Sequence, residues 1–122
     1  MSAPVPRWNQ DAKQASLAYL VELLLVGRRF RLPGGSGVIL GRDKIENGVL
    51  KAVGFGTIVS PVNVPGPTAV IPELMGENDL TMAKELVCAY SKYDRLDGNI
   101  VLNVGEVPRP YDRGKFKEYQ IC

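Results

Sequence analysis

Three stretches of this chain carry apolar residues three and four positions apart, the spacing of an amphipathic helix. They span 11–26, 43–53 and 79–93. The residues expected to face inward are Leu17, Leu20, Val21 and Leu24 in the first; Ile45, Val49 and Val53 in the second; and Met82, Ala83, Leu86, Val87 and Tyr90 in the third. Asp43 and Asp79 are the expected N-caps of the last two helices, because a short carboxylate accepts the unpaired amide protons of a first turn.

Shorter stretches alternate between apolar and polar residues or are rich in β-branched residues, and these predict strands. The first two, 29–32 and 38–40, flank the glycine-rich sequence 33–37, which predicts a hairpin turn. Residues 107–111 are expected to be extended because of their prolines. Further strands are expected at 57–60, 68–71, 100–104 and 116–121, the last as a terminal edge strand. The order of elements predicts an α+β fold, with a mostly antiparallel sheet and about three helices packed on one face.

The length of 122 residues is that of one domain. We expect a loose leader at 1–10 and a single domain over 11–122. Segment 61–67 contains three prolines, which fix the backbone and predict a stiff, exposed loop between two strands. A rigid loop loses little entropy on contact, so this loop is a candidate docking edge; a plain crossover between strands is the alternative.

The net charge of +2 says little about partners, but the charges are unevenly distributed. Cations outnumber acids between positions 28 and 51. The cations are Arg28, Arg29, Arg31, Arg42, Lys44 and Lys51, and the acids are Asp43 and Glu46. Because these cations flank the predicted hairpin and the start of the second helix, we expect them to converge into a basic patch that attracts an anionic partner.

Several kinds of catalytic site have no counterpart in this sequence. The chain has no histidine, the commonest general base, and it has neither a glycine-rich phosphate-binding loop nor a nucleophile elbow. Two cysteines, Cys88 and Cys122, make neither a disulfide framework nor a zinc site, and Cys88 falls on the apolar face of a predicted helix. We therefore expect no catalytic residue, no metal site, no cofactor and no enzymatic activity.

The apolar stretch 19–26 is too short to cross a membrane, which takes about 20 apolar residues, and it contains Glu22. No signal peptide is visible in the sequence. The expected location is the cytoplasm, without membrane attachment.

Three sequence blocks carry a resemblance to a known family. The blocks are 29–43 with Glu46, Asn47 and Leu50; 56–59 leading to 64–71; and 86–92. Their most specific parts are Gly41-Arg42-Asp43 followed by Asn47, and Tyr90-Ser91-Lys92. Residues 28–103 resemble the RNA-binding domain of the NFACT ribosome-quality-control proteins. They resemble more closely the variant of that domain appended to tRNA 2-thiouridylase-like proteins.

The resemblance implies an α+β fold and the binding of structured RNA, chiefly tRNA. The quality-control members carry an Asp followed by an aromatic residue and a His in the strand that matches Thr57 to Ser60. This chain has neither an acid nor a histidine there. The thiouridylase chemistry belongs to a separate nucleotide-binding domain, so the resemblance implies a module that assists a tRNA-thiolating enzyme by holding tRNA.

We therefore expect a non-catalytic RNA-binding module whose cations pair with phosphates. The candidate RNA-binding residues are Arg28, Arg29, Arg31, Arg42, Lys44 and Lys92. The candidate base-stacking residues are Phe30 and Tyr93, whereas Tyr90 is expected mainly in the core. The expected partners are RNA, with tRNA foremost, and a tRNA thiouridylase-like ATP-pyrophosphatase protein.

Other interpretations of the sequence stay open. A protein-interaction module would use the proline-rich loop 61–67 and an edge strand to dock a partner or a second copy. A small-ligand or nucleotide binder would use the glycines of 34–37. The arginines of the first strand could also be a solvated strand face with no partner.

Overall fold

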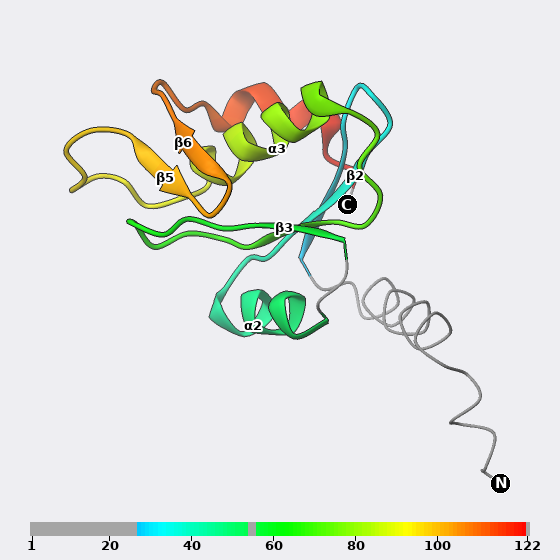
Figure 1. Ribbon diagram of the computed structural model, residues 1–122, viewed down its shortest axis with the longest axis horizontal. Helices are drawn as coiled ribbons and strands as arrows, with labels where there is room; N and C mark the ends of the chain where they lie inside the picture. Colours follow the sequence, from blue (N-terminus) through cyan, green and yellow to red (C-terminus); the bar gives the residue numbers. More distant parts are fainter. Residues whose placement is uncertain (1–26, 54–55, 122) are drawn as a thin grey trace, which may run out of the picture.

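Two antiparallel sheets, two α-helices and a 3-10 helix make up the part of the chain that the computed structural model describes, residues 27–53 and 56–121 (Figure 1). The elements are β1 (Arg28–Arg31), β2 (Gly37–Leu40), α2 (Lys44–Val53), β3 (Thr57–Val59), β4 (Ala69–Ile71), α3 (Glu77–Ala89), β5 (Ile100–Leu102), β6 (Gly105–Val107) and the 3-10 helix η2 (Arg113–Tyr119). The predicted α+β class is confirmed. The expected leader 1–10 and helix 11–26 lie outside the described residues.

The larger sheet has the strand order β1-β2-β4-β3, and the smaller one pairs β5 with β6. The predicted hairpin forms between β1 and β2, with Phe30 opposite Val38. Its turn is closed by two backbone hydrogen bonds, from Leu32 N to the Ser36 carbonyl and from Gly35 N to the Leu32 carbonyl, each 2.9 Å. In the middle of the sheet, Val70 of β4 lies between Ile39 of β2 and Ile58 of β3.

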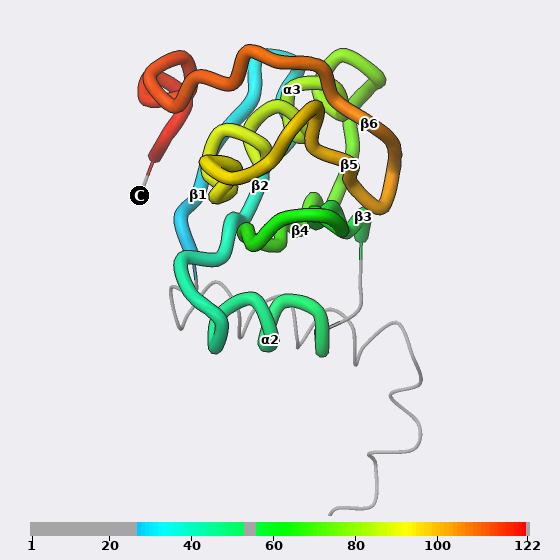
Figure 2. Tube along the Cα trace, turned by 90° about the vertical axis from the view of Figure 1, so that its left-hand side faces the viewer, coloured from blue at the N-terminus to red at the C-terminus, as the bar shows by residue number. Residues whose placement is uncertain are grey.

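Both faces of the larger sheet are covered, by different helices (Figures 1 and 2). Side chains at alternate positions point to opposite faces of a strand. Six sheet residues face the main core, which α3 covers: Phe30, Val38, Leu40, Val59, Ala69 and Ile71. Ile39 and Val70 face the other way and pack against Leu50 of α2. The helices therefore do not share one face as expected, because these strands are apolar on both sides.

Helix α2 faces the sheet with a different side than its sequence pattern indicated. Leu50 is buried, at 1% exposure, whereas Ile45 is 78% exposed and Val49 37% exposed. The expectation that Ile45 and Val49 point inward is therefore wrong; the side chain of Val53 lies outside the described part. A hydrogen bond also holds α2 in this orientation: Asn47 Oδ1 accepts the backbone N–H of Thr68, beside β4, at 2.9 Å.

The two expected helix caps have different outcomes. Asp43 immediately precedes α2, and its Oδ1 accepts a 2.9 Å hydrogen bond from the backbone N–H of Glu46, as an N-cap does. Asp79, in contrast, lies inside the first turn of α3, which Gly76 precedes. The prediction that Asp79 caps this helix is wrong; its carboxylate instead crosses to the β1–β2 turn.

The carboxylate of Asp79 holds that turn against α3. One oxygen accepts the backbone N–H of Gly34 at 3.0 Å and the other accepts that of Ser36 at 2.9 Å. Asp79 is only 2% exposed. Burial by itself raises the pKa of this carboxyl, but hydrogen bonds from Ser36 and Gly34 outweigh burial and lower the pKa below its ordinary value of 3.8. The carboxylate therefore stays ionised at neutral pH inside the fold.

The predicted terminal strand 116–121 is wrong for most of its length, because residues 113–119 form η2. In a 3-10 helix, side chains three positions apart lie on one side, and Phe116 and Tyr119 pack there with ring centres 6.5 Å apart. Phe116 is buried in the main core. After η2 the chain pairs with β1, through a bridge between Gln120 and Phe30 and a 2.9 Å hydrogen bond from the Ile121 backbone N–H to the Arg29 carbonyl.

The predicted strand 100–104 ends early, since β5 stops at Leu102 and the chain turns into β6. Gly105 has a φ of +131°, a conformation that side chains other than glycine rarely adopt. The turn residue Asn103 reaches the edge of β3, where it accepts the backbone N–H of Ser60 at 2.9 Å and donates to the Ile58 carbonyl at 2.8 Å. These bonds occupy part of the β3 edge, one of the two edges of the larger sheet.

Candidate nucleic-acid interface

The arginines of β1 point to opposite faces of the sheet. Arg28 lies on the same side as Phe30, whereas Arg29 and Arg31 alternate with them and lie on the other side. The expected convergence of all the cations near the hairpin is therefore wrong. Its physical cause is the two-residue period of the strand, which separates neighbouring side chains.

Four of the six candidate RNA-binding residues nevertheless line one pocket of about 480 Å³. We call this the basic pocket, and its cations are Arg28, Arg42, Lys44, Lys92 and Arg113. They come from β1, the β2–α2 connection with the start of α2, the segment after α3, and the start of η2. Among the described residues that line it, Asp43 is the only acid, and that carboxylate also caps α2.

An aromatic ring, that of Tyr90, lines the basic pocket close to two of its arginines. The guanidinium carbon of Arg28 is 5.0 Å from the ring centre, and that of Arg113 is 4.7 Å away. Arg113 is also held by a 3.1 Å hydrogen bond from its Nε to the Ala89 carbonyl at the end of α3. The Phe30 ring, in the core, packs edge-on against the Tyr90 ring, with the ring centres 6.1 Å apart. Tyr90 and the two arginines thus form one contiguous cluster, which we call the Arg–Tyr cluster.

Arg42 is oriented by Glu46, one turn further along the chain. Their closest atoms, Arg42 Nη2 and Glu46 Oε2, are 2.7 Å apart, and Glu46 Oε1 also accepts the backbone N–H of Arg42 at 2.8 Å. The side-chain hydrogen bond from Arg42 is the main cause that lowers the pKa of Glu46 to about 2. Arg42 keeps half of its side chain exposed. It is therefore pre-positioned at the pocket with part of its charge balanced.

The proline-rich loop 61–67 forms one wall of the basic pocket through Pro65, Gly66 and Pro67. The Lys92 backbone N–H donates to the Pro65 carbonyl at 2.8 Å, which fixes the loop beside the end of α3. Gly66 is required at this close approach, because a Cβ there would come within 2.2 Å of Ser91 Oγ. This loop, expected as a stiff docking edge, thus shapes the same site as the cations.

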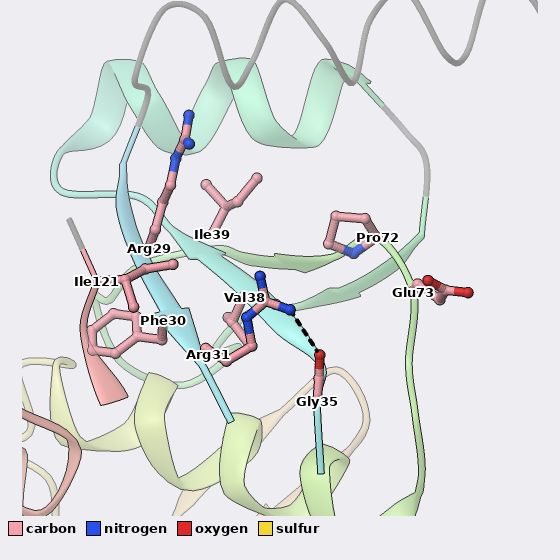
Figure 3. Close-up of a pocket in the computed structure, with 10 residues that line it drawn as sticks. Arg29, Phe30, Arg31, Gly35, Val38, Ile39, Pro72, Glu73 and Ile121 are labelled. Atoms are coloured by element: carbon pink, nitrogen blue, oxygen red, sulfur yellow. Dashed lines mark hydrogen bonds between the residues drawn. The ribbon is translucent and has the colours of Figure 1, made fainter. Parts of the chain in front are cut away.

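Arg29 and Arg31 line a second pocket of about 390 Å³ (Figure 3). Figure 3 shows Arg29 directed toward α2 and Arg31 toward the turn, where Arg31 Nη1 donates to the Gly35 carbonyl at 3.4 Å. The other described residues of the lining are mostly apolar, with one acid: Phe30, Gly35, Gly37, Val38, Ile39, Pro72, Ile121 and Glu73. The RNA-binding role of Arg29 and Arg31 stays a prediction, for a surface separate from the basic pocket.

The aromatic residues differ in what they can offer a base. Phe30 is 1% exposed in the main core, so the expectation that it stacks on a base is wrong. Tyr93 packs edge-on against Tyr111 at 5.0 Å, with the Arg109 guanidinium 5.1 Å from its ring centre. Its stacking role stays a prediction. The half-buried ring that lines the basic pocket is that of Tyr90, which also packs against the core as expected.

Sequence reasoning missed Arg113 as a site residue. It lies 71 positions after Arg42 in the chain and enters the pocket only because η2 packs beside α3 (Figure 1). The concentration of cations near the C-terminus was the one available signal, and it did not single out Arg113 from Arg109, Lys115 or Lys117.

Within 27–53 and 56–121, no three His, Cys, Asp or Glu side chains are grouped so that they could hold a metal ion. Cys88 is fully buried, and burial together with Glu85 raises the pKa of its thiol to about 12, so this sulfur is a poor nucleophile. No helix in the described part is long and apolar enough to span a membrane.

Comparison with known proteins identifies the domain. A family model described as the NFACT protein RNA binding domain matches residues 27–115. This range extends from β1 through β6 and includes all five cations of the basic pocket. No curated protein and no solved structure gives a significant match. The match extends over well more than half of the sequence, and no catalytic domain is detected. The chain thus belongs to the family of NFACT RNA-binding domains.

Proposed function

We propose that this protein is a non-catalytic module that binds structured RNA, with tRNA foremost, and that the basic pocket is its phosphate-binding site. The observation that carries the proposal is the meeting of five cations from four separate segments around one pocket of about 480 Å³. Arginine pairs with phosphate oxygens through two parallel hydrogen bonds, and lysine binds them as a point charge. The membership in a family of RNA-binding domains supports RNA as the polyanion.

The test is a titration of the full chain with unmodified tRNA at several salt concentrations. Each phosphate that a cation neutralises releases counterions, so the logarithm of the binding constant should fall linearly with the logarithm of salt concentration. Three to five phosphate contacts would give a slope of roughly −2 to −4. A binding constant that ignores salt, or the absence of binding at low salt, would overturn the proposal.

We further propose that the bound tRNA is presented to a thiouridylase-like ATP-pyrophosphatase protein, acting in the cytoplasm. The support is the resemblance of the Gly41-Arg42-Asp43 and Tyr90-Ser91-Lys92 blocks to the variant found in such proteins. Adding this chain should lower the KM of such an enzyme for tRNA, and the effect should vanish when the basic pocket is neutralised. An unchanged KM would contradict this partnership without affecting RNA binding itself.

A change at Glu46 should strengthen RNA binding. Glu46→Gln removes the negative charge that now balances Arg42 at 2.7 Å, so a phosphate no longer competes with this carboxylate for the guanidinium. Exposed ion pairs are worth up to about 1 kcal/mol, so affinity should rise roughly twofold to fivefold. The measurement is a tRNA titration at fixed salt. The matched control is Glu73→Gln, which makes the same charge change in the second pocket. An equal gain in both variants would show a general charge effect only.

A further inference from the structure

We infer, resting on the proposed function, that the basic pocket receives an unpaired nucleotide of the RNA, from a loop or a strand end, and does not grip a duplex stem. The first argument is shape. The cations surround a concavity of about 480 Å³, within the usual size of small-molecule pockets. A duplex backbone is a convex surface that would touch only the exposed rim, whereas a splayed-out nucleotide can enter.

The second argument is the chemistry inside the pocket. Unpaired RNA bases stack on aromatic rings and on arginine guanidinium planes. The Arg–Tyr cluster offers both kinds of group, with Arg28 and Arg113 within 5.0 Å of the Tyr90 ring centre. Two contacts hold the cluster in place before any ligand binds. Phe30 packs against the Tyr90 ring from the core, and Arg113 Nε donates a hydrogen bond to the Ala89 carbonyl. A base that enters therefore meets a pre-organised stacking surface, which reduces the entropy lost on binding.

The third argument is the distribution of exposure among the cations. Arg42, Lys44 and Lys92 are exposed, and they are positioned to hold the phosphates on either side of the inserted nucleotide. Arg28, which is half-buried, and Arg113, which is exposed, lie beside the ring. Among its described lining residues, the second pocket lacks this combination, because the one aromatic residue there, Phe30, is buried in the core.

The experiment compares three RNAs with equal numbers of phosphates: a single strand, a hairpin with an unpaired loop, and a blunt-ended duplex. The first two should bind the full chain about tenfold more tightly than the duplex at the same salt, because base–aromatic stacking adds affinity that is largely independent of sequence. 2-Aminopurine placed in the unpaired loop should lose fluorescence on binding, and the same base in the duplex stem should not.

Variants at two tyrosines locate the effect. Tyr90→Leu should remove the preference for unpaired RNA while the weaker duplex binding remains, and Tyr90→Phe should keep the preference. Tyr119→Leu, at a half-buried ring outside the basic pocket, is the matched control for loss of a ring. If Tyr90→Leu does not fold, the 2-aminopurine fluorescence measured with the wild-type protein tests the inference by itself: quenching in the unpaired loop supports it, and no quenching contradicts it. Equal, salt-dependent binding of all three RNAs without quenching overturns the inference and leaves the proposed function standing, whereas no binding of any RNA overturns both.

Discussion

Replacing Arg42, Lys44 and Lys92 together by alanine should weaken tRNA binding by about a hundredfold at low salt. All three side chains are exposed and line the basic pocket. If each neutralises one phosphate, the salt slope should become shallower by roughly 2 to 3. The fold should survive, because all three side chains lie at the surface and the Arg42–Glu46 ion pair, with Arg42 half exposed, contributes about 1 kcal/mol. Titrations at several salt concentrations measure both quantities, and a thermal melt checks the fold.

The matched control for this variant is the triple replacement of Lys51, Arg95 and Lys117 by alanine. These residues are equally charged and exposed, and none of them lines the basic pocket. The control should lose only a few-fold in affinity through the reduced net charge. If both triple variants weaken binding equally, the affinity comes from overall charge and the pocket has no special role.

Replacing Arg29 and Arg31 together by alanine tests whether the second pocket contributes to RNA binding.

Replacing Asp79 by alanine should lower the free energy of unfolding by about 2 to 4 kcal/mol, a large fraction of the stability of a small domain. The change leaves the backbone N–H groups of Gly34 and Ser36 without their carboxylate partner at a site that is almost fully buried. It also detaches the β1–β2 turn from α3. Urea denaturation measures the effect. Asp94→Ala, at an exposed position, is the control and should change stability by less than about 0.5 kcal/mol.

The side chain of Asp79 should stabilise the fold at neutral pH and lose this contribution in acid. Although burial opposes it, the hydrogen bonds from Ser36 and Gly34 hold the pKa of Asp79 below 3.8 in the folded state. A carboxyl whose pKa is lower when folded contributes stability above its unfolded pKa, and this contribution is lost as the pH falls through the folded value. The difference between the wild type and Asp79→Ala should thus be full at neutral pH and shrink below about pH 4. A difference that grows in acid would contradict the bonding described here.

Local elements were predictable because their causes are local. The β1–β2 hairpin follows from alternating residues on either side of a glycine-rich turn, and α2 follows from Asp43 and the spacing behind it. The role of Asp79 was not predictable in this way, since its partners, Gly34 and Ser36, are more than 40 positions away. Similarly, η2 replaced the expected strand because Phe116 and Tyr119 pack on one side of it beside α3, a contact that exists only in the folded chain.

In the candidate site, too, some features followed from local sequence and others from contacts between distant segments. The alternation of strand side chains was visible in the sequence and already implied that Arg28 and Arg29 face opposite ways, yet the density of charge suggested convergence. The burial of Phe30 depends on α3 covering that face of the sheet. The inclusion of Arg113 depends on η2 lying beside α3. These two outcomes removed Phe30 from the site and added Arg113, besides the separation of Arg29 and Arg31 from the other cations.

For this protein, the sequence alone determined the α+β class, most of the elements, the presence of an excess of cations near the first hairpin, and the family resemblance. Only the tertiary structure decided that Arg28, Arg42, Lys44 and Lys92 share a pocket with Tyr90 and Arg113 while Arg29 and Arg31 do not. The physical reason is that periodicity and turn chemistry act over a few residues. Which side chains meet depends on strand order and helix packing, which bring distant segments together.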